Sequence, residues 1–227
     1  MSPPNLTVPR LIGAKEGILA VYKPAGMLAH PSAEAQAPDL ISWLRSQGGA
    51  LRKALPAHRL DLETSGIVLC AQDPDARAAL GRAFEDGLIH KTYLAVVIGQ
   101  AHEKGVIRRP LQDARRGHAL DAVTRYRLVE ALGGFSLLSL QPETGRKHQI
   151  RRHLQGVGLP VVGDTRYPGP RKVKVPGFPH RLWLHAQVVE LPSGARFECA
   201  LPPELEDSLK LMREGAAKVA PSPNEPG

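Results

Sequence analysis

Hydrophobic and polar positions follow two periods along this chain. Runs of consecutive apolar residues, bounded by glycine, proline or charged residues, predict buried β-strands. These strands are expected at the start of 17–31 and within 66–71, 91–99, 122–132, 135–143 and 181–192. The two runs on either side of Gly133-Gly134 predict an antiparallel pair.

Apolar residues at helical spacing separate these runs. Residues 39–47 predict a short core helix, and residues 73–87 predict a longer one. Asp73 is placed to cap the longer helix and Gly87 to end it. The expected buried face of that helix consists of Ala76, Leu80 and Phe84.

This alternation of strands and helices predicts one mixed α/β domain over residues 15–208. Residues 1–14 are expected to form a loose lead-in, and residues 209–227 a tail that is disordered at its end. A loop is expected at 48–57 and a mobile hairpin at 101–121.

Composition limits the classes of protein that fit. Apolar residues make up 42% of the 227 residues, and no run approaches the roughly 18 needed for a membrane span. The first ten residues lack the features of a secretory signal. Cys70 and Cys199 are too few for a disulfide scaffold and fit a reducing compartment, so we expect a cytoplasmic protein. No cysteine or histidine spacing suggests a zinc site.

The net charge of +8 comes from one stretch of the chain. Residues 146–181, called the basic stretch below, hold nine Lys/Arg and one acidic residue, whereas the remainder holds 21 of each sign. One interpretation is a solvated basic face. We favour the other, a surface that binds a polyanion, because the excess of one sign is clustered.

Residues 58–71, HRLDLETSGIVLCA, place charged side chains directly before an apolar strand. The turn at Thr64-Ser65-Gly66 would fix the backbone there while leaving the preceding side chains free to face a cleft. One interpretation of Asp61 is a turn residue that accepts backbone N–H bonds. The other is a nucleophile or base, which needs a nearby cation and a rigid mount. The spacing leaves both interpretations open.

A third helix is predicted to start within TGRKHQIRRHLQ, with Thr144 as its cap. Its expected buried stripe consists of Ile150, Leu154 and Val157. Its neighbouring face is basic and consists of His148, Arg151, Arg152 and Gln155. These cations would repel one another without an anionic partner, so they are either solvated or paired with phosphates and a carboxylate.

These segments resemble the RluA-type pseudouridine synthases. The motifs HRLDLETSGIVL, KTYLAV and TGRKHQIRRHL stand in the order and spacing of that family, and VYKPAGMLAHP, GLPVVGDTRY and RLWLHA also match. The resemblance runs from about residue 15 to residue 205. It implies an α+β fold, with a mixed, largely antiparallel central sheet flanked by helices and a central active-site cleft.

The resemblance also implies roles for single residues. Asp61 matches the catalytic aspartate, Tyr93 the tyrosine that stacks on the flipped uracil, and Arg151 the arginine that pairs with the aspartate. Contacts to RNA are implied, in order along the chain, for His58, Arg59, Lys91, Arg146 and His148. Arg59 matches the residue that helps to displace the target base. Structural roles are implied for Asp164 and His185.

The implied reaction isomerises uridine to pseudouridine in structured RNA, either ribosomal or transfer RNA, and needs no cofactor and no metal. The carboxylate attacks the anomeric carbon or removes a ribose proton to give a glycal, and the sequence leaves both routes open. We expect a monomer whose partner is an RNA stem-loop and not a membrane. One alternative is a non-catalytic RNA-binding or assembly factor, which would need the basic helix but not Asp61 or Tyr93. Another is a hydrolase that releases the free base.

Overall fold

The computed structural model describes residues 8–32, 36–114, 116–170 and 173–219. Its strands are β1 (Arg10–Lys15), β2 (Ile18–Lys23), β3 (Leu55–Pro56), β4 (Ser65–Ala71), β5 (His90–Ile98), β6 (Lys104–Arg108), β7 (Leu111–Asp113), β8 (His118–Leu120), β9 (Val123–Leu132), β10 (Phe135–Pro142), β11 (Leu184–Glu190) and β12 (Arg196–Glu198). Its helices are α1 (Leu40–Ser46), α2 (Gly49–Lys53), α3 (Pro74–Glu85), α4 (Gln149–Gly156) and α5 (Pro203–Val219).

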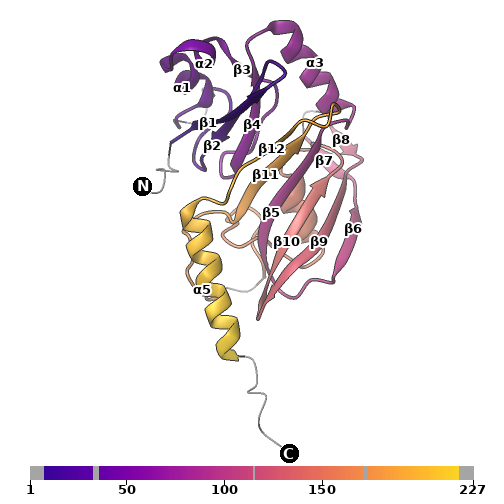
Figure 1. Cartoon of the computed structure of the whole chain (residues 1–227). Helices are drawn as coiled ribbons and strands as arrows, with labels where there is room; N and C mark the ends of the chain where they lie inside the picture. Colours follow the sequence, from indigo (N-terminus) through magenta and orange to yellow (C-terminus); the bar gives the residue numbers. More distant parts are fainter. Residues whose placement is uncertain (1–7, 33–35, 115, 171–172, 220–227) are drawn as a thin grey trace, which may run out of the picture.

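One ten-stranded sheet organises the molecule (Figure 1). Its order is β1-β2-β4-β11-β5-β10-β9-β6, with β3 added to β4 and β12 added to β11. Every pairing between these strands is antiparallel except that of β4 with β11. The expected α+β fold with a mixed, largely antiparallel sheet is therefore confirmed.

The parallel contact between β4 and β11 joins the two halves of the sheet. It is short, pairing Ser65 with His185 and Gly66 with Ala186. Gly66 has a φ of 127°, and a Cβ placed on it would lie 2.2 Å from the carbonyl oxygen of Ala186. Only glycine allows the two backbones to approach this closely. The Thr-Ser-Gly sequence thus sets the position of the loop that carries Asp61 relative to β11.

The register of the strands places one row of residues across the centre of the sheet. In order from β2 to β6, the row consists of Lys23, Gly66, Ala186, Tyr93, Leu140, Tyr126 and Gly105. Side chains of residues that lie opposite one another point to the same face. Lys23 and Tyr93 therefore share a face of the sheet across the junction of its two halves.

The apolar pattern predicted most of these elements correctly. Each of the six predicted strands is present, and β9 and β10 pair antiparallel on either side of Gly133. In α3 the Asp73 carboxylate accepts a hydrogen bond from the N–H of Ala76 at 2.9 Å, as expected of a cap. Leu80 is buried in this helix, and Phe84 packs partly buried against the same cluster.

Three expectations for irregular segments are wrong. The lead-in boundary at residue 14 falls inside β1, which pairs with β2. The segment expected as a loop at 48–57 contains α2 and β3. The boundary at 208 falls inside α5, where Leu209 and Met212 are buried, because these side chains continue an apolar face that begins at Leu205. The end of the expected tail, residues 220–227, lies outside the described residues.

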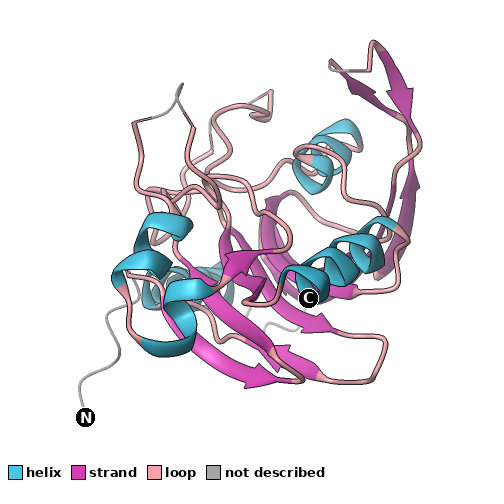
Figure 2. Cartoon of the chain, turned by 90° about the horizontal axis from the view of Figure 1, so that it is seen from above, coloured by secondary structure: helices cyan, strands magenta, loops and turns pink. Residues whose placement is uncertain are grey.

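The segment 101–121 contributes both to the sheet and to a separate hairpin. β6 extends the edge of the main sheet, and β7 and β8 pair only with each other. Arg152 donates to the carbonyl of Gln112 at 3.1 Å, and a ring nitrogen of His153 lies 3.0 Å from the carbonyl of Arg109. These contacts attach the hairpin to α4, and Figure 2 shows the two rising on one side of the sheet. Mobility of the hairpin stays a prediction.

The start of α4 differs from its prediction. The helix begins at Gln149, after His148 in a left-handed conformation, and Thr144 makes no cap. Instead the Thr144 hydroxyl donates to the Gln149 side chain at 2.6 Å, because that amide turns back over the preceding loop. Ile150 and Leu154 are buried as expected, but Val157 is 48% exposed.

Candidate active site

Asp61 lies in the loop between β3 and β4, and both sides of this loop are fixed by backbone hydrogen bonds. The N–H of Thr64 donates to the carbonyl of Asp61 at 3.1 Å, closing the turn. The N–H of Gly26 donates to the carbonyl of Leu62 at 2.8 Å, tying the loop to the turn after β2. The Asp61 side chain is 25% exposed, so it is reachable from solvent while its backbone is held.

Lys23 clamps the same loop from inside the protein. Its side chain is fully buried, and its ammonium donates to the carbonyls of Met27 at 2.8 Å, Pro24 at 3.0 Å and Leu62 at 3.4 Å. Burial and, to a smaller extent, the charge of Arg181 lower the pKa of Lys23, and Asp61 acts in the opposite direction. The net pKa is about 7. Sequence reasoning missed this residue. Its only signal was a lysine ending an apolar strand directly before a Pro-x-Gly turn.

His148 faces Asp61 from the start of α4. Its Nε2 lies 3.8 Å from an Asp61 carboxylate oxygen, and its Nδ1 lies 3.0 Å from the hydroxyl of Tyr167. Burial lowers the pKa of His148, which Asp61 counteracts in part. His148 thus faces Asp61, and its expected contact with RNA stays a prediction.

Tyr93 approaches Asp61 from the sheet. It lies on β5 opposite Ala186 and packs against two of the apolar clusters. Burial raises the pKa of the Tyr93 hydroxyl, and the negative charge of Asp61 raises it further. The structure therefore brings together Asp61, Lys23, Tyr93 and His148, which are far apart in the sequence.

Arg151 has a different carboxylate partner from the one expected. Its Nε and Nη2 each donate to Asp164 at 2.7 Å, and its Nη1 lies 2.6 Å from Glu63. Its side chain is 1% exposed. In this structure Arg151 therefore pairs with Asp164 and Glu63 in place of the expected Asp61. Because Glu63 lies two residues after Asp61, Arg151 still positions the loop.

The buried ion pair is stable for a physical reason. Burial acts to lower the pKa of Arg151, but the hydrogen bonds and charges of Asp164 and Glu63 raise it above its ordinary value. Asp164 also accepts from the N–H groups of Arg166 and Tyr167 at 2.9 and 2.8 Å. A buried charge with this many partners escapes the cost of an uncompensated one. The structural role expected for Asp164 fits these contacts.

His58 is also committed to structure. Its Nε2 accepts a hydrogen bond from the N–H of Leu69 at 2.9 Å, and its ring centroid lies 4.1 Å from that of Phe84. Burial lowers the pKa of His58 to about 3, so the ring is neutral at physiological pH. These contacts link the loop to β4 and α3, and a contact of His58 with RNA stays a prediction.

The other expected RNA contacts are placed around the loop. Arg59 is exposed. The ammonium of Lys91 lies 5.5 Å from the centre of the Phe84 ring, and burial lowers its pKa. Arg146 donates from Nε to the carbonyl of Asp121 at 3.1 Å. Contacts of these three residues with RNA stay predictions.

The basic stretch offers fewer free cations than its composition suggested. Arg151 is buried in ion pairs, and Arg181 bonds to Glu204 at 2.8 Å and to the hydroxyl of Ser65 at 2.8 Å. The exposed cations among its described residues are Lys147, Arg166 and Lys174. Arg171 and Lys172 lie outside the described residues.

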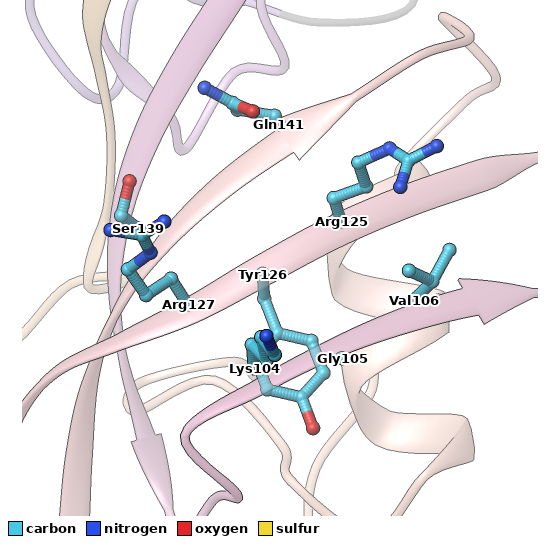
Figure 3. A pocket seen from close by; sticks show the side chains of 8 residues that line it. All are labelled: Lys104, Gly105, Val106, Arg125, Tyr126, Arg127, Ser139 and Gln141. Atoms are coloured by element: carbon cyan, nitrogen blue, oxygen red, sulfur yellow. The ribbon is translucent and has the colours of Figure 1, made fainter.

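A hollow of about 640 Å³ lies elsewhere, over β6, β9 and β10 (Figure 3). Arg127, which lines it, is opposite Lys104 and Ser139 in the sheet. Ser139 neighbours Leu140, the partner of Tyr93, so the side chains of this basic row point to the face away from Tyr93. Gly105 and Tyr126, which also line the hollow, belong to the row of Tyr93, whereas Asp61 is not among the lining residues.

Two further properties concern cofactors and membranes. Within the described parts of the chain, no three His, Cys, Asp or Glu side chains are grouped so that they could hold a metal ion. No helix among the described residues is both long and apolar enough to cross a bilayer.

The geometry can support carboxylate chemistry on a polyanionic substrate. Asp61 is held by a backbone fixed on both sides of its loop, and its carboxylate faces the Nε2 of His148 at 3.8 Å. An aromatic side chain, Tyr93, lies close enough for its hydroxyl to experience the charge of Asp61. A nucleophile or base, an aromatic platform and exposed cations are therefore available within one region.

Comparison with known proteins agrees with this geometry. Residues 17–156 match the family model described as RNA pseudouridylate synthase. An uncharacterized RNA pseudouridine synthase of Chloroflexus aurantiacus is 36% identical over 86% of this chain and 66% of its own length. The ribosomal large subunit pseudouridine synthase D of Xanthomonas campestris is 33% identical over 89% of this chain and 69% of its own length. The chain thus spans about two thirds of the length of these two relatives.

A transfer RNA enzyme and a solved structure extend the comparison. The tRNA pseudouridine synthase C of Haemophilus ducreyi is 33% identical over 76% of this chain and 80% of its own length. The human RNA pseudouridylate synthase domain containing 4 shares the fold, with a TM-score of 0.76 and 24% identity over 89% of this chain and 92% of that one. This chain therefore belongs to the RNA pseudouridylate synthases, a family of isomerases.

Proposed function

We propose that this protein isomerises uridine to pseudouridine in structured RNA, with Asp61 as the catalytic carboxylate. The observation that carries the proposal is the setting of the Asp61 carboxylate: its loop is fixed from both sides, His148 faces it at 3.8 Å, and its charge acts on the Tyr93 hydroxyl and on Lys23. A turn residue with a purely structural role would not need these three groups around its carboxylate. The names of the relatives, which include ribosomal and transfer RNA enzymes, support RNA as the substrate.

The residues divide the reaction between them. Asp61 attacks the anomeric carbon or removes a ribose proton, and in either case the bond between ribose and uracil nitrogen breaks. Tyr93 holds the detached uracil while it turns over, since stacking on an aromatic ring is worth about 1–3 kcal/mol. The target must leave its helix first, and we propose that the exposed Arg59 fills the gap. Rejoining through carbon adds and removes no atoms overall: the uracil nitrogen gains a proton and the carbon that bonds to ribose loses one.

We propose that the exposed cations of the basic stretch contact the phosphates of a stem-loop. Lys147 and Arg166 flank His148 and Tyr167, which places their charges beside the Asp61 site. Arg carries its charge at every physiological pH and docks on phosphate with two hydrogen bonds. We also propose that the protein acts as a monomer in the cytoplasm.

The test is to incubate the protein with short stem-loops from ribosomal and transfer RNA, then digest the RNA to nucleosides and separate them. Pseudouridine has the mass of uridine but a different retention, so the product is identified directly. We expect pseudouridine to form in excess EDTA on a stem-loop that folds without magnesium. Release of free uracil would indicate the hydrolase instead. Tight binding to a comprehensive set of stem-loops without either product would indicate the non-catalytic binding protein.

A further inference from the structure

We infer that His148 is a positioning residue for Asp61, oriented by Tyr167, and not a direct contact to RNA. The inference rests on the proposed function, because it concerns the same carboxylate. His148 faces Asp61, whereas Arg151 pairs with Asp164 and Glu63.

The backbone of His148 is held in an unusual conformation. Its φ is 52°, and among the described residues only Glu16 and His180 are other non-glycine residues with positive φ. Such residues persist where the surroundings fix them, and they cluster at functional sites. Here the next residue, Gln149, is anchored: its amide donates to the carbonyl of Val123 at 2.9 Å. The start of α4 therefore holds the His148 ring in place.

The side-chain contacts of His148 define its orientation and its tautomer. A carboxylate only accepts hydrogen bonds, so the favourable arrangement places the proton on Nε2, the nitrogen that faces Asp61. Nδ1 then accepts from the hydroxyl of Tyr167, 3.0 Å away. The backbone N–H of Tyr167 donates in turn to Asp164, the buried partner of Arg151. One chain of contacts thus links Asp61 to the buried ion pair.

A neutral imidazole suits this role. Burial lowers the pKa of His148, and the positive charges of Arg151, Arg166 and Lys147 lower it too, against the effect of Asp61. A neutral N–H fixes the rotamer of the carboxylate without adding a cation that would weaken its basicity. The present separation of 3.8 Å is longer than a hydrogen bond, but contacts at active sites commonly tighten when the substrate binds.

Exposure argues against a direct RNA contact. The His148 side chain is only 11% exposed, whereas its neighbour Lys147 on the same loop is exposed. One ring edge is occupied by Tyr167 and the other faces Asp61. Little of the ring is left for RNA.

The test uses the full chain and three variants. His148→Asn removes the ring but retains a residue that tolerates a left-handed backbone, and Tyr167→Phe removes only the hydroxyl. At saturating stem-loop RNA we expect His148→Asn to lower the single-turnover rate by about 10–100-fold, since a misplaced catalytic group can cost that much. Tyr167→Phe should lower it by a smaller factor. The double variant should match His148→Asn, because both changes act through one ring. The Kd for RNA should stay within about twofold.

Two controls separate this role from structural and RNA-binding roles. His180→Asn makes the same replacement at a second histidine with a φ of 52°. Its melting temperature shows how much this replacement alone changes stability. NMR of the ring nitrogens, which needs no activity, should find the His148 proton on Nε2 in wild type and a shift toward Nδ1 in Tyr167→Phe. A protein that makes no pseudouridine would refute the proposed function while leaving this tautomer measurable. A proton on Nδ1 in wild type, a wild-type rate in His148→Asn, or a loss confined to Kd would overturn the positioning role.

Discussion

The hydroxyl of Tyr93 stays protonated at neutral pH, because burial and the charge of Asp61 both raise its pKa. It can therefore serve the reaction as a hydrogen-bond donor or within a proton relay to the Asp61 carboxylate. Tyr93→Phe retains the ring and its stacking but removes this hydroxyl. We expect its single-turnover rate to fall by about tenfold or more, with RNA affinity unchanged.

Tyr126→Phe is the matched control for Tyr93→Phe. Tyr126 lies in the same row of the sheet, with its ring against Gly105. The control should turn over at the wild-type rate, measured by rapid quench with enzyme in excess over RNA. A wild-type rate in the Tyr93 variant would restrict Tyr93 to stacking.

Two buried histidines predict how stability depends on pH. Burial lowers the pKa of His58 to about 3 and that of His185 to about 4, from an ordinary value of 6.5. The unfolded chain therefore binds more protons than the folded protein below pH 6.5. The stability that these two neutral rings contribute is fully present above pH 6.5. It is lost progressively as the pH falls from 6.5 toward 3–4.

Urea unfolding at pH 7, 6 and 5 checks this prediction. The free energy of unfolding should fall with decreasing pH. His58→Gln should make its dependence on pH shallower, because up to one proton fewer is taken up on unfolding. His102→Gln, at an exposed position, should leave the slope unchanged. Equal stability at pH 5 and pH 7 would contradict the buried, neutral state of these rings.

At the scale of elements, Lys23 joins the end of β2 to the loop before β4. Replacing it by Met preserves most of the volume but leaves the carbonyls of Met27, Pro24 and Leu62 without their donor in a dry site. We expect Lys23→Met to lower the free energy of unfolding by about 3 kcal/mol. Hydrogen exchange at the N–H of Gly26, which bonds to Leu62, should become faster.

Lys15→Met provides the comparison for Lys23→Met. Lys15 is exposed and donates to one carbonyl, that of Arg196, at 2.9 Å. Its replacement should cost less than about 1 kcal/mol in urea unfolding. Equal costs for the two variants would show that the Lys23 clamp does not hold the loop.

At the scale of the whole molecule, exposed cations lie in two separate groups. Lys147, Arg166 and Lys174 lie in loops of the basic stretch, whereas Lys104 and Arg127 line the hollow over β6, β9 and β10. Three phosphate contacts predict a loss of RNA affinity of about twentyfold between 50 and 200 mM salt. Lys147→Gln and Arg166→Gln should each reduce the slope of log Kd against log salt by about one.

Arg127→Gln removes the same charge from the face away from Tyr93. Fluorescence anisotropy with a labelled stem-loop should show no change in its salt slope. A larger change in the salt slope for Arg127→Gln than for Arg166→Gln would show that RNA binds at the hollow instead.

Local pattern was sufficient to predict some elements and insufficient for others. The apolar run after Gly66 and the capped helix from Asp73 form through local spacing, so β4 and α3 were predictable. β1 was not, because RLIGAK has too few consecutive apolar residues and forms a strand only by pairing with β2. α5 continues past residue 208 because it packs on the sheet, which no local signal shows.

The candidate site shows the same division. The family resemblance implied that Asp61 and Tyr93 share one site, whereas the spacing of residues predicted only the short segment around each of them. The partners of Arg151 depend on how the Asp164 turn and the Glu63 loop meet around α4. The contact of the His58 ring with Phe84 of α3 is likewise set by tertiary packing. Partners contributed by distant segments are set by tertiary packing and escape prediction from spacing.

The central claim is that Asp61 performs the chemistry, and Asp61→Asn tests it most directly. Asn retains the shape and the capacity to accept hydrogen bonds, but it is neither a nucleophile nor a base at this position. We expect the variant to melt like wild type, bind RNA equally well and lose at least ten-thousandfold in single-turnover rate, which corresponds to about 5.5 kcal/mol. Asp73→Asn, at the cap of α3, controls for the replacement itself.

The decisive measurement is the single-turnover rate of pseudouridine formation by Asp61→Asn, taken with its melting temperature and RNA affinity on one preparation. The account predicts a folded protein that binds RNA and forms no detectable pseudouridine. A normally folded Asp61→Asn variant that forms pseudouridine at a rate near that of wild type would contradict it.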